Sequence, residues 1–321
     1  MSRRFIVSAS MAVAASAAIA SFAVKSAPPA AASGNYSDWG APVNLGSAIN
    51  TTASEQHPAI SKDGLTLYFS SDRPGGQGGL DLWVAHRESE EASWGTPVNL
   101  SAPINSAGAE FAPAFSPDGH KLYYHSDRPG GFGLLDLYVC TRTHTDDDQD
   151  WGPPVNLGGD VNSIYNDAGP TLFVDEDGTT TMWFTVLNKP GGLGDWDIYR
   201  SVMGADGAFG APENVVELNS AYRDTRTTIR HDGREMILTS ERPGGVNTGP
   251  GRADLWVSTR DTPADAWATP VNLGDTVNGP TFDGAPALSW DGKTLFFYSN
   301  RTGGAGGNDL WMTTRRHPGN Q

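Results

Sequence analysis

Five acidic residues stand at one fixed place in a repeated pattern, and carboxylates arranged in this way can do chemistry. Each acid follows an asparagine by five residues. Glycoside hydrolysis uses two carboxylates, one as general acid and the other as nucleophile or base, and Ca²⁺ also takes oxygen ligands. The pattern leaves three interpretations open: capping of backbone amides within each repeat, a cation shared near a common axis, or catalysis. The five acids are Glu55, Glu110, Asp167, Asp224 and Asp283.

If the chain is an enzyme, the best candidates for catalytic carboxylates are Asp167 and Asp224, with Glu55 opposite them. An active site of this kind needs two carboxylates in different environments. Acids that recur so regularly offer little difference between their surroundings. The sequence also contains no nucleophile elbow, histidine-rich metal motif or phosphate-binding loop. These observations favour a protein that binds over one that catalyses.

A second group of residues breaks the repeat just before or after the acids, or in a lengthened turn. Residues shared by every repeat serve the scaffold, whereas residues that differ are free to form a site. We expect this group to rim one pocket over the acids, where aromatic rings and arginines suit a glycan or a protein segment. The group consists of His57, Tyr165, Tyr222, Arg223, Arg226, Arg252 and Phe282.

The elements that position these residues follow from an internal repeat of 55 to 58 residues. A phrase of the type Trp-Gly-x-Pro-Val-Asn-Leu begins at Trp39 and recurs at Trp94, Trp151, Phe209 and Trp267. Each copy continues with the acid, an Asp-Gly turn between two runs rich in β-branched and aromatic residues, and a glycine-rich turn before a last run. This order predicts four antiparallel strands per repeat, which is one propeller blade.

The ends of the repeat predict how the ring closes. The pattern starts with the Trp39 strand alone and stops one strand short of a blade after Leu310-Trp311-Met312. The N-terminal strand therefore completes the last blade, and closure removes exposed sheet edges. We predict an all-β, five-bladed propeller over residues 39–317, after a signal peptide at 1–32 and a short linker at 33–38. We also expect Arg73 of the glycine-rich turn to pair with Asp81 of the same turn, and likewise in the other blades.

The sequence Ser71-Asp72-Arg73-Pro74-Gly75-Gly76, followed by Asp81-Leu82-Trp83, resembles the TolB-like propeller repeat, also called the WD40-like Tol-Pal repeat. The resemblance covers the whole predicted propeller. It implies a propeller of a bacterial envelope or secreted protein. These blades occur in periplasmic protein-binding subunits, in cell-wall-associated proteins and beside enzyme domains.

The net charge of the chain and its first 32 residues indicate where the protein is located and which partners are excluded. The chain has 37 Asp and Glu against 22 Lys and Arg, a net charge of −15, which argues against nucleic acid as a partner. Arg3 and Arg4 precede a long run rich in alanine, and Ala30-Ala31-Ala32 suits a signal peptidase. We expect a periplasmic or secreted bacterial protein with no membrane span after cleavage, and a monomer.

The sequence taken alone favours a binding or interaction protein that recognises a glycan or an envelope protein at the channel mouth. The alternative is a carbohydrate-active enzyme, a furanosidase-like glycoside hydrolase that uses the axial carboxylates. A second alternative is a structural scaffold of the envelope. No cofactor is required on any of these interpretations, although the five acids leave room for Ca²⁺.

Overall fold

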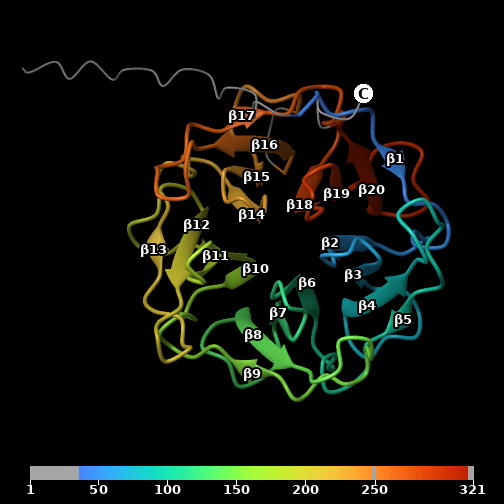
Figure 1. Cartoon of the computed structure of the whole chain (residues 1–321), viewed down its shortest axis with the longest axis horizontal. Coiled ribbons are helices and arrows are strands. Elements are labelled where there is room, and N and C mark those ends of the chain that lie inside the picture. The colour runs from blue at the N-terminus through green and yellow to red at the C-terminus, as the bar shows by residue number, and fades with distance from the viewer. Residues whose placement is uncertain (1–35, 248–250, 317–321) are drawn as a thin grey trace, which may run out of the picture.

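Five four-stranded antiparallel sheets surround a central axis in the computed structural model, which describes residues 36–247 and 251–316 (Figure 1). Each inner strand begins at one of the five acids, and the next two strands continue outward as the Asp-Gly and glycine-rich turns predict. The prediction of an all-β, five-bladed propeller is confirmed. The strands are β1 (Val43–Asn44), β2 (Glu55–Ile60), β3 (Thr66–Ser71), β4 (Asp81–His86), β5 (Val98–Asn99), β6 (Glu110–Phe115), β7 (Lys121–Ser126), β8 (Asp136–Thr141), β9 (Val155–Asn156), β10 (Asp167–Val174), β11 (Thr180–Leu187), β12 (Trp196–Val202), β13 (Glu213–Asn214), β14 (Asp224–Ile229), β15 (Glu235–Ser240), β16 (Asp254–Thr259), β17 (Val271–Asn272), β18 (Asp283–Leu288), β19 (Thr294–Ser299) and β20 (Asp309–Thr314).

Blade one consists of β2–β5, blade two of β6–β9, blade three of β10–β13 and blade four of β14–β17. Blade five combines β18–β20 with β1, which pairs with β20 through Val43 and Met312. The N-terminal strand thus closes the ring, as predicted. The predicted signal peptide at 1–32 and the start of the linker lie outside the described residues. Within the described residues, no helix is long and apolar enough to cross a membrane.

The closure is reinforced beside β1 by aromatic and cationic side chains. The Tyr36 hydroxyl donates to the Asp291 carbonyl oxygen at 2.9 Å. The Arg315 guanidinium lies 4.0 Å from the Tyr36 ring centroid and 4.3 Å from that of Trp39. Arg315 also pairs with the buried carboxylate of Glu235 in blade four. The first described residues therefore bind two blades at once.

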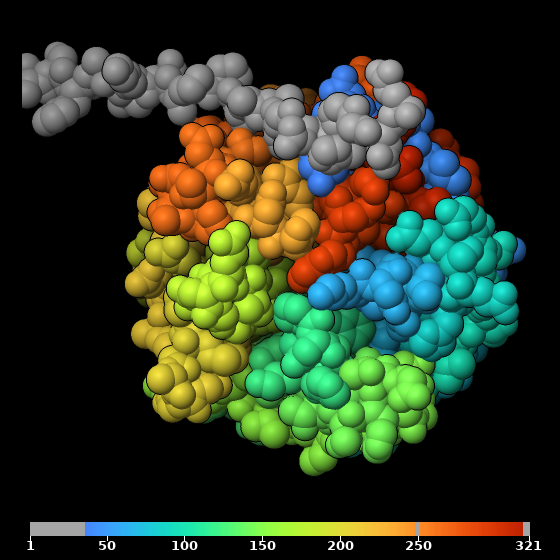
Figure 2. All heavy atoms as spheres, in the orientation of Figure 1, coloured from blue at the N-terminus to red at the C-terminus, as the bar shows by residue number. Residues whose placement is uncertain are grey.

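The hydrophobic core lies between neighbouring blades. One cluster, for example, joins Tyr68 and Leu82 of blade one to Leu122 and Tyr124 of blade two. Each sheet buries both faces against its neighbours, so the middle strands are almost entirely buried. Figure 2 shows the result from one face, with the five blades converging on the axis. The inner strands that meet there carry the candidate site.

Candidate functional site

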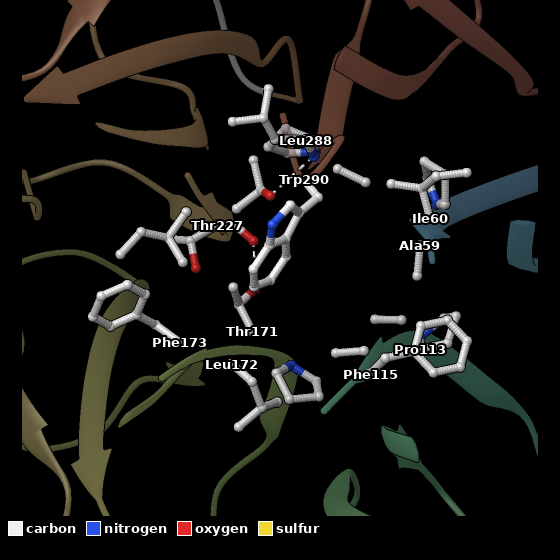
Figure 3. Close-up of a pocket in the computed structure, with 18 of the residues that line it drawn as sticks. Ala59, Ile60, Pro113, Phe115, Thr171, Leu172, Phe173, Thr227, Leu288 and Trp290 are labelled. Carbon is white, nitrogen blue, oxygen red and sulfur yellow. Dashed lines mark hydrogen bonds between the residues drawn. The ribbon is translucent and has the colours of Figure 1, made fainter. Parts of the chain in front are cut away.

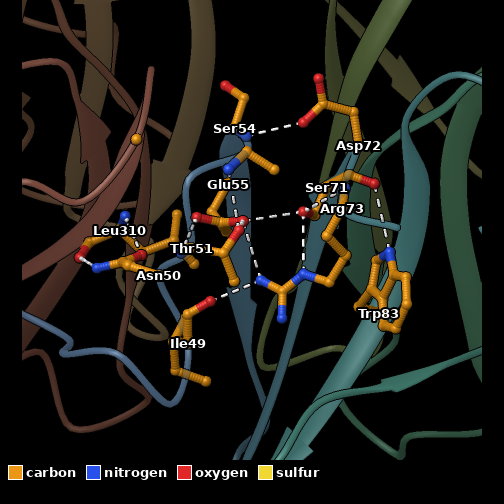
Figure 4. A network of polar contacts seen from close by, with 12 residues as sticks. Ile49, Asn50, Thr51, Ser54, Glu55, Ser71, Asp72, Arg73, Trp83 and Leu310 are labelled. Carbon is orange, nitrogen blue, oxygen red and sulfur yellow. Dashed lines mark hydrogen bonds and ion pairs between the residues drawn. The ribbon is translucent and has the colours of Figure 1, made fainter. Parts of the chain in front are cut away.

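The five repeated acids are all fully buried, with 0% exposure, and each is bonded within its own blade. In blade one, Glu55 accepts hydrogen bonds from the Thr51 backbone N–H and hydroxyl, each at 2.8 Å, and from the Ser71 hydroxyl at 3.0 Å. The Arg73 guanidinium lies 3.1 Å from the same carboxylate and also donates to the Ile49 carbonyl oxygen at 2.5 Å (Figure 4). Glu55 thus fastens the connection into the blade to the inner strand and to the glycine-rich turn.

Three other blades repeat this network. In each, the acid accepts a hydrogen bond from the backbone N–H four residues before it. It also pairs with the arginine of the glycine-rich turn and, in blades two and four, accepts from the serine on the neighbouring strand. A buried carboxylate that is paired and hydrogen-bonded in this way is a satisfied structural group. The ion pairs join Glu110 to Arg128, Asp224 to Arg242 and Asp283 to Arg301.

Asp167 of blade three is the exception. The position of Ser71 is taken by Val186, which pairs with Asp167 across the sheet, and the position of Arg73 is taken by Lys189. Ser163 donates its backbone N–H at 2.6 Å and its hydroxyl at 2.9 Å to Oδ2, whereas the buried Oδ1 has no hydrogen-bond partner. Burial raises the pKa of Asp167 to about 6, opposed by the Ser163 bonds and by Lys189. Burial also raises the pKa of Asp283, but that carboxylate keeps its arginine, so Asp167 differs from the other four in its hydrogen-bond partners.

The predicted pairing of Arg73 with Asp81 is wrong. Arg73 pairs with Glu55 instead, while Asp81 accepts from the Gln77 backbone N–H and, at 3.2 Å, from the Asn99 amide. Both acids recur in every blade, so their spacing alone did not show which one faces the guanidinium. The aspartate of the glycine-rich turn caps that turn and ties it to the outer strand.

A cation shared by the five acids lacks the ligand cluster it would need. The described residues hold no group of three or more His, Cys, Asp or Glu side chains arranged to bind a metal ion. Four of the acids already accept bonds from an arginine, and all five accept a backbone N–H of their own blade. The proposed central Ca²⁺ site formed by Glu55, Glu110, Asp167, Asp224 and Asp283 is therefore not supported by the arrangement of these side chains.

The inner strands enclose a cavity of about 170 Å³ along the axis. It is smaller than the roughly 300–1,000 Å³ of pockets that bury drug-sized ligands, so it accommodates one small group rather than a long chain. Every inner strand bulges two residues after its acid, where the backbone has a positive φ. Three of these positions are small, but two carry large polar side chains that line the cavity: His57 (φ 52°) and Arg226 (φ 47°).

Arg226 reaches across the axis to blade three. A Cβ on Gly169 would lie 2.5 Å from Arg226 Nη1, so only glycine leaves room for the guanidinium there. Its Nη2 lies 3.4 Å from Nε2 of His125 on β7, and the His57 ring lies 6.5 Å from the His125 ring and 5.3 Å from that of Tyr298 on β19. Four blades thus contribute side chains to one cluster, hereafter the arginine cluster: Arg226, His57, His125 and Tyr298.

Burial controls the protonation of the arginine cluster. It lowers the pKa of Arg226 to about 10 and raises that of Tyr298 to about 12. Burial and, next, the charge of Arg226 hold the pKa values of His57 and His125 well below the usual range. At neutral pH the cluster therefore carries one positive charge on the guanidinium, two neutral imidazoles and a protonated phenol.

The remaining predicted ligand residues are only partly brought together. Phe282 stacks on Tyr298 with ring centroids 5.1 Å apart, and Arg223 lies nearby, 4.0 Å from Glu241. Tyr165 instead packs against the apolar cluster between blades two and three. Tyr222 is 49% exposed, and Arg252 is exposed beside residues outside the described range. The predicted single rim is thus reduced to His57, Arg226, Phe282 and Arg223, since Tyr165 belongs to the packing of the blades.

Sequence reasoning missed Trp290, which lies at the Asp-Gly hairpin end of the cavity and points its ring into it (Figure 3). Its ring is 37% exposed, stacks on His231 at 5.2 Å, and lies 4.4 Å from the Lys62 ammonium. The signal was present in the repeat: the residue before the Asp-Gly turn differs in every blade. The residues predicted from sequence lie in or beside the connections at the other end of the inner strands, so the hairpin end was not considered.

Comparison with known proteins yields structures but no sequence relatives: no protein-family model and no curated protein matches the chain. A thermostable family-43 glycoside hydrolase matches 84% of this chain and 91% of its own at 14% identity, with a TM-score of 0.57. An α-L-arabinofuranosidase from Podospora anserina matches 88% and 97% at 14% identity (TM-score 0.55), and an endo-arabinase from Bacteroides thetaiotaomicron 87% and 97% at 14% identity (TM-score 0.54). At these identities the likeness shows the fold.

These matches correct the functional preference drawn from sequence. We favoured a binding or interaction protein and leaned against an enzyme, but the similar structures that share the ring over most of both chains are glycoside hydrolases. TolB from Acinetobacter baumannii matches 88% of this chain and 66% of its own at 15% identity, with a TM-score of 0.49. Membership of the TolB-like family stays a prediction.

Proposed function

We propose that this protein is a carbohydrate-active enzyme, a glycoside hydrolase that acts on furanose-containing glycans. The observation that carries the proposal is the environment of Asp167. It is the one inner-strand acid without an arginine or a strand serine, and burial brings its pKa to about 6. A perturbed carboxylate among similar ones is a candidate for catalysis. The ring shared with arabinofuranosidases and an endo-arabinase supports the substrate class.

Asp167 suits the role of general acid. A general acid works best when its pKa lies near the operating pH, because it must hold a proton and also release it. The second carboxylate must act in its charged form as nucleophile or base. Asp224 and Glu55, the other two candidates from sequence, are each held by an arginine of their own blade, at 2.5 Å to Arg242 and at 3.1 Å to Arg73, so either must leave that ion pair to take this role.

Access to Asp167 requires a local movement. The side chain is fully buried under the connection that leads into β10, and Ser163 of that connection supplies both of its hydrogen bonds. The proposal therefore includes an outward shift of residues 163–166 when a glycan binds. Ile164 in this connection is 78% exposed, whereas Tyr165 packs between blades two and three, so the shift must move the Tyr165 ring or pivot beside it.

The same proposal covers location and assembly. The predicted signal peptide directs the chain to the periplasm or the exterior, where polymeric glycans are found. We propose that it works there as a monomer, because the five blades already pack against one another around the ring.

The test is product release from furanose-, pyranose- and uronate-containing polysaccharides by the parent protein and by Asp167→Asn. We expect the parent to release sugars and the variant to lose at least about 100-fold, which is the lower range for a general acid. The matched control is Asp283→Asn, the same substitution at the same place in blade five. Its folded fraction should keep the parent's specific activity. Absence of product from the folded parent, or equal activity of Asp167→Asn, would overturn the proposal.

A further inference from the structure

The cavity contains a guanidinium that no acid neutralises. No ion pair within 4.0 Å joins Arg226 to a carboxylate of the described residues, although 13 such pairs occur elsewhere. Its Nη1 is buried and has no hydrogen-bond partner. An unpaired buried charge is costly, and the usual remedy is a partner of opposite sign. The chain has a net charge of −15, so acidic residues are plentiful, yet none pairs with Arg226 within the described residues.

The two imidazoles add further donors. His57 is 7% exposed, and its Nδ1 has no partner. Nε2 of His125 lies 3.4 Å from Arg226 Nη2, and the tautomer of the ring decides which of the two donates. The free Nδ1 of His57 can bond to a group bound beside the guanidinium.

The size of these side chains also sets them apart. Ala112, Gly169 and Ala285 show that small residues satisfy the bulge position of the ring. The left-handed conformation costs Ala112 and Ala285 as much as it costs His57 and Arg226, since all four residues carry a Cβ. What distinguishes His57 and Arg226 is the large polar side chain that each places in the cavity.

We propose that the arginine cluster binds the carboxylate group of a uronic acid sugar in the substrate. A carboxylate supplies the missing negative charge and accepts bonds from Arg226 and the imidazoles, and guanidinium matches carboxylate in shape. The Tyr298 ring, stacked on Phe282, forms an apolar wall beside the charge, which suits the face of a sugar ring. The assignment to a sugar rests on the proposed function, whereas the carboxylate site rests on the cluster itself.

The test is binding of glucuronate and galacturonate, measured by calorimetry and by the shift in melting temperature, with glucose and galactose as neutral counterparts. We expect the two uronates to bind the parent and the neutral sugars to bind at least about tenfold more weakly, as the loss of a hydrogen bond to a charged group implies. Equal binding of acidic and neutral sugars would overturn the proposal, and so would binding of acetate as tight as that of glucuronate.

Variants separate the site from the surface. Arg226→Gln should weaken uronate binding by at least about tenfold and raise the melting temperature of the free protein, because an uncompensated buried charge is removed. Arg200→Gln is the matched control, since that arginine is exposed and pairs with Glu213 on the outer strands of blade three; it should bind as the parent does. His57→Gln tests the second donor without touching the charge. Unchanged uronate affinity in Arg226→Gln would overturn the site.

The two proposals fail separately. These sugars are monomers without a glycosidic bond, so their binding does not depend on catalysis. If the protein binds uronates but releases no product, the carboxylate site is supported and the hydrolase proposal is wrong. If Arg226→Gln releases product as the parent does, on acidic and neutral glycans alike, the hydrolase proposal is supported and the carboxylate site is wrong.

Discussion

Asp167 shows how a single position in a repeat can acquire different chemistry without a change in the fold. Its carboxylate occupies the same place as four others and keeps the backbone bond they all share. What it lacks is a serine and an arginine, replaced by Val186 and Lys189. Burial raises the pKa of Asp167 to about 6, and no arginine or strand serine is present to offset that effect.

This environment predicts a pH-dependent cost in stability. The folded pKa of Asp167, about 6, lies above the ordinary value of 3.8. The folded state therefore holds the proton more tightly, and stability is lost as pH rises through the interval between about 4 and 6. Asp167→Asn keeps the acceptor for Ser163 without the charge. We expect it to raise the free energy of unfolding by about 1–3 kcal/mol at pH 8 and by much less at pH 4.

Urea unfolding of parent and variant at both pH values checks this expectation. Glu110→Gln serves as the comparison, because that acid has an arginine partner, Arg128, to lose and should be destabilised at pH 8. A variant at Asp167 that is less stable than the parent at pH 8 would contradict the assigned environment.

The sequence could predict where the special residues stand but not what they touch. The fixed interval placed all five acids at the start of inner strands, and the break in the repeat singled out His57 and Arg226. The same interval could not distinguish Glu55 from Asp81 as the partner of Arg73, because both acids recur with it. It also could not bring His125 into the site, since that residue reaches the axis from a second strand.

At the scale of a blade, the acid and the arginine act as a clamp that joins the inner strand to the glycine-rich turn. Blade three lacks the clamp yet keeps the same four strands, with β10 and β11 each eight residues long against six in the other blades. Longer strands add ladder bonds, which can offset the missing ion pair. Blade three thus offers a natural control for the value of the clamp.

Arg73→Ala should destabilise the protein by about 3–5 kcal/mol, because it leaves the buried Glu55 carboxylate without its counter-charge. Lys189→Ala, at the equivalent position of blade three, should cost no more than about 1 kcal/mol, since Lys189 makes no ion pair within 4.0 Å among the described contacts. Urea unfolding of both variants gives the comparison. Equal losses in the two blades would show that the ion pair is not what stabilises blade one.

At the scale of the whole molecule, the ring depends on a very short strand. β1 is two residues long, and its pairing with β20 joins positions at opposite ends of the described chain. Tyr36 and Trp39 strengthen this junction through Arg315. The repeat begins with one outer strand and ends one strand short of a blade, and these complementary ends predict the closure. The N-terminal strand pairs with the edge of the last sheet, which would otherwise be exposed.

A chain that begins at Gly46 should therefore be less stable than one that begins at Tyr36, by at least about 3 kcal/mol, the usual cost of losing a packed tryptophan. It should also self-associate, because β20 becomes an open edge. Urea unfolding and sedimentation velocity measure the two effects. A shortened chain that remains monomeric and equally stable would show that β1 does not hold the ring together.

Because the two ends of the described chain meet in one blade, the same ring could be formed by a chain that starts in another blade. Joining residue 316 to residue 36 by a flexible linker, and opening the exposed Asp146–Asp150 connection instead, would give a circular permutant with the same sheets and a different blade assembled from both termini. The axial cavity draws its side chains from four blades, so it should be rebuilt unchanged. Where the polypeptide starts is, for this ring, a matter of synthesis and export rather than of architecture.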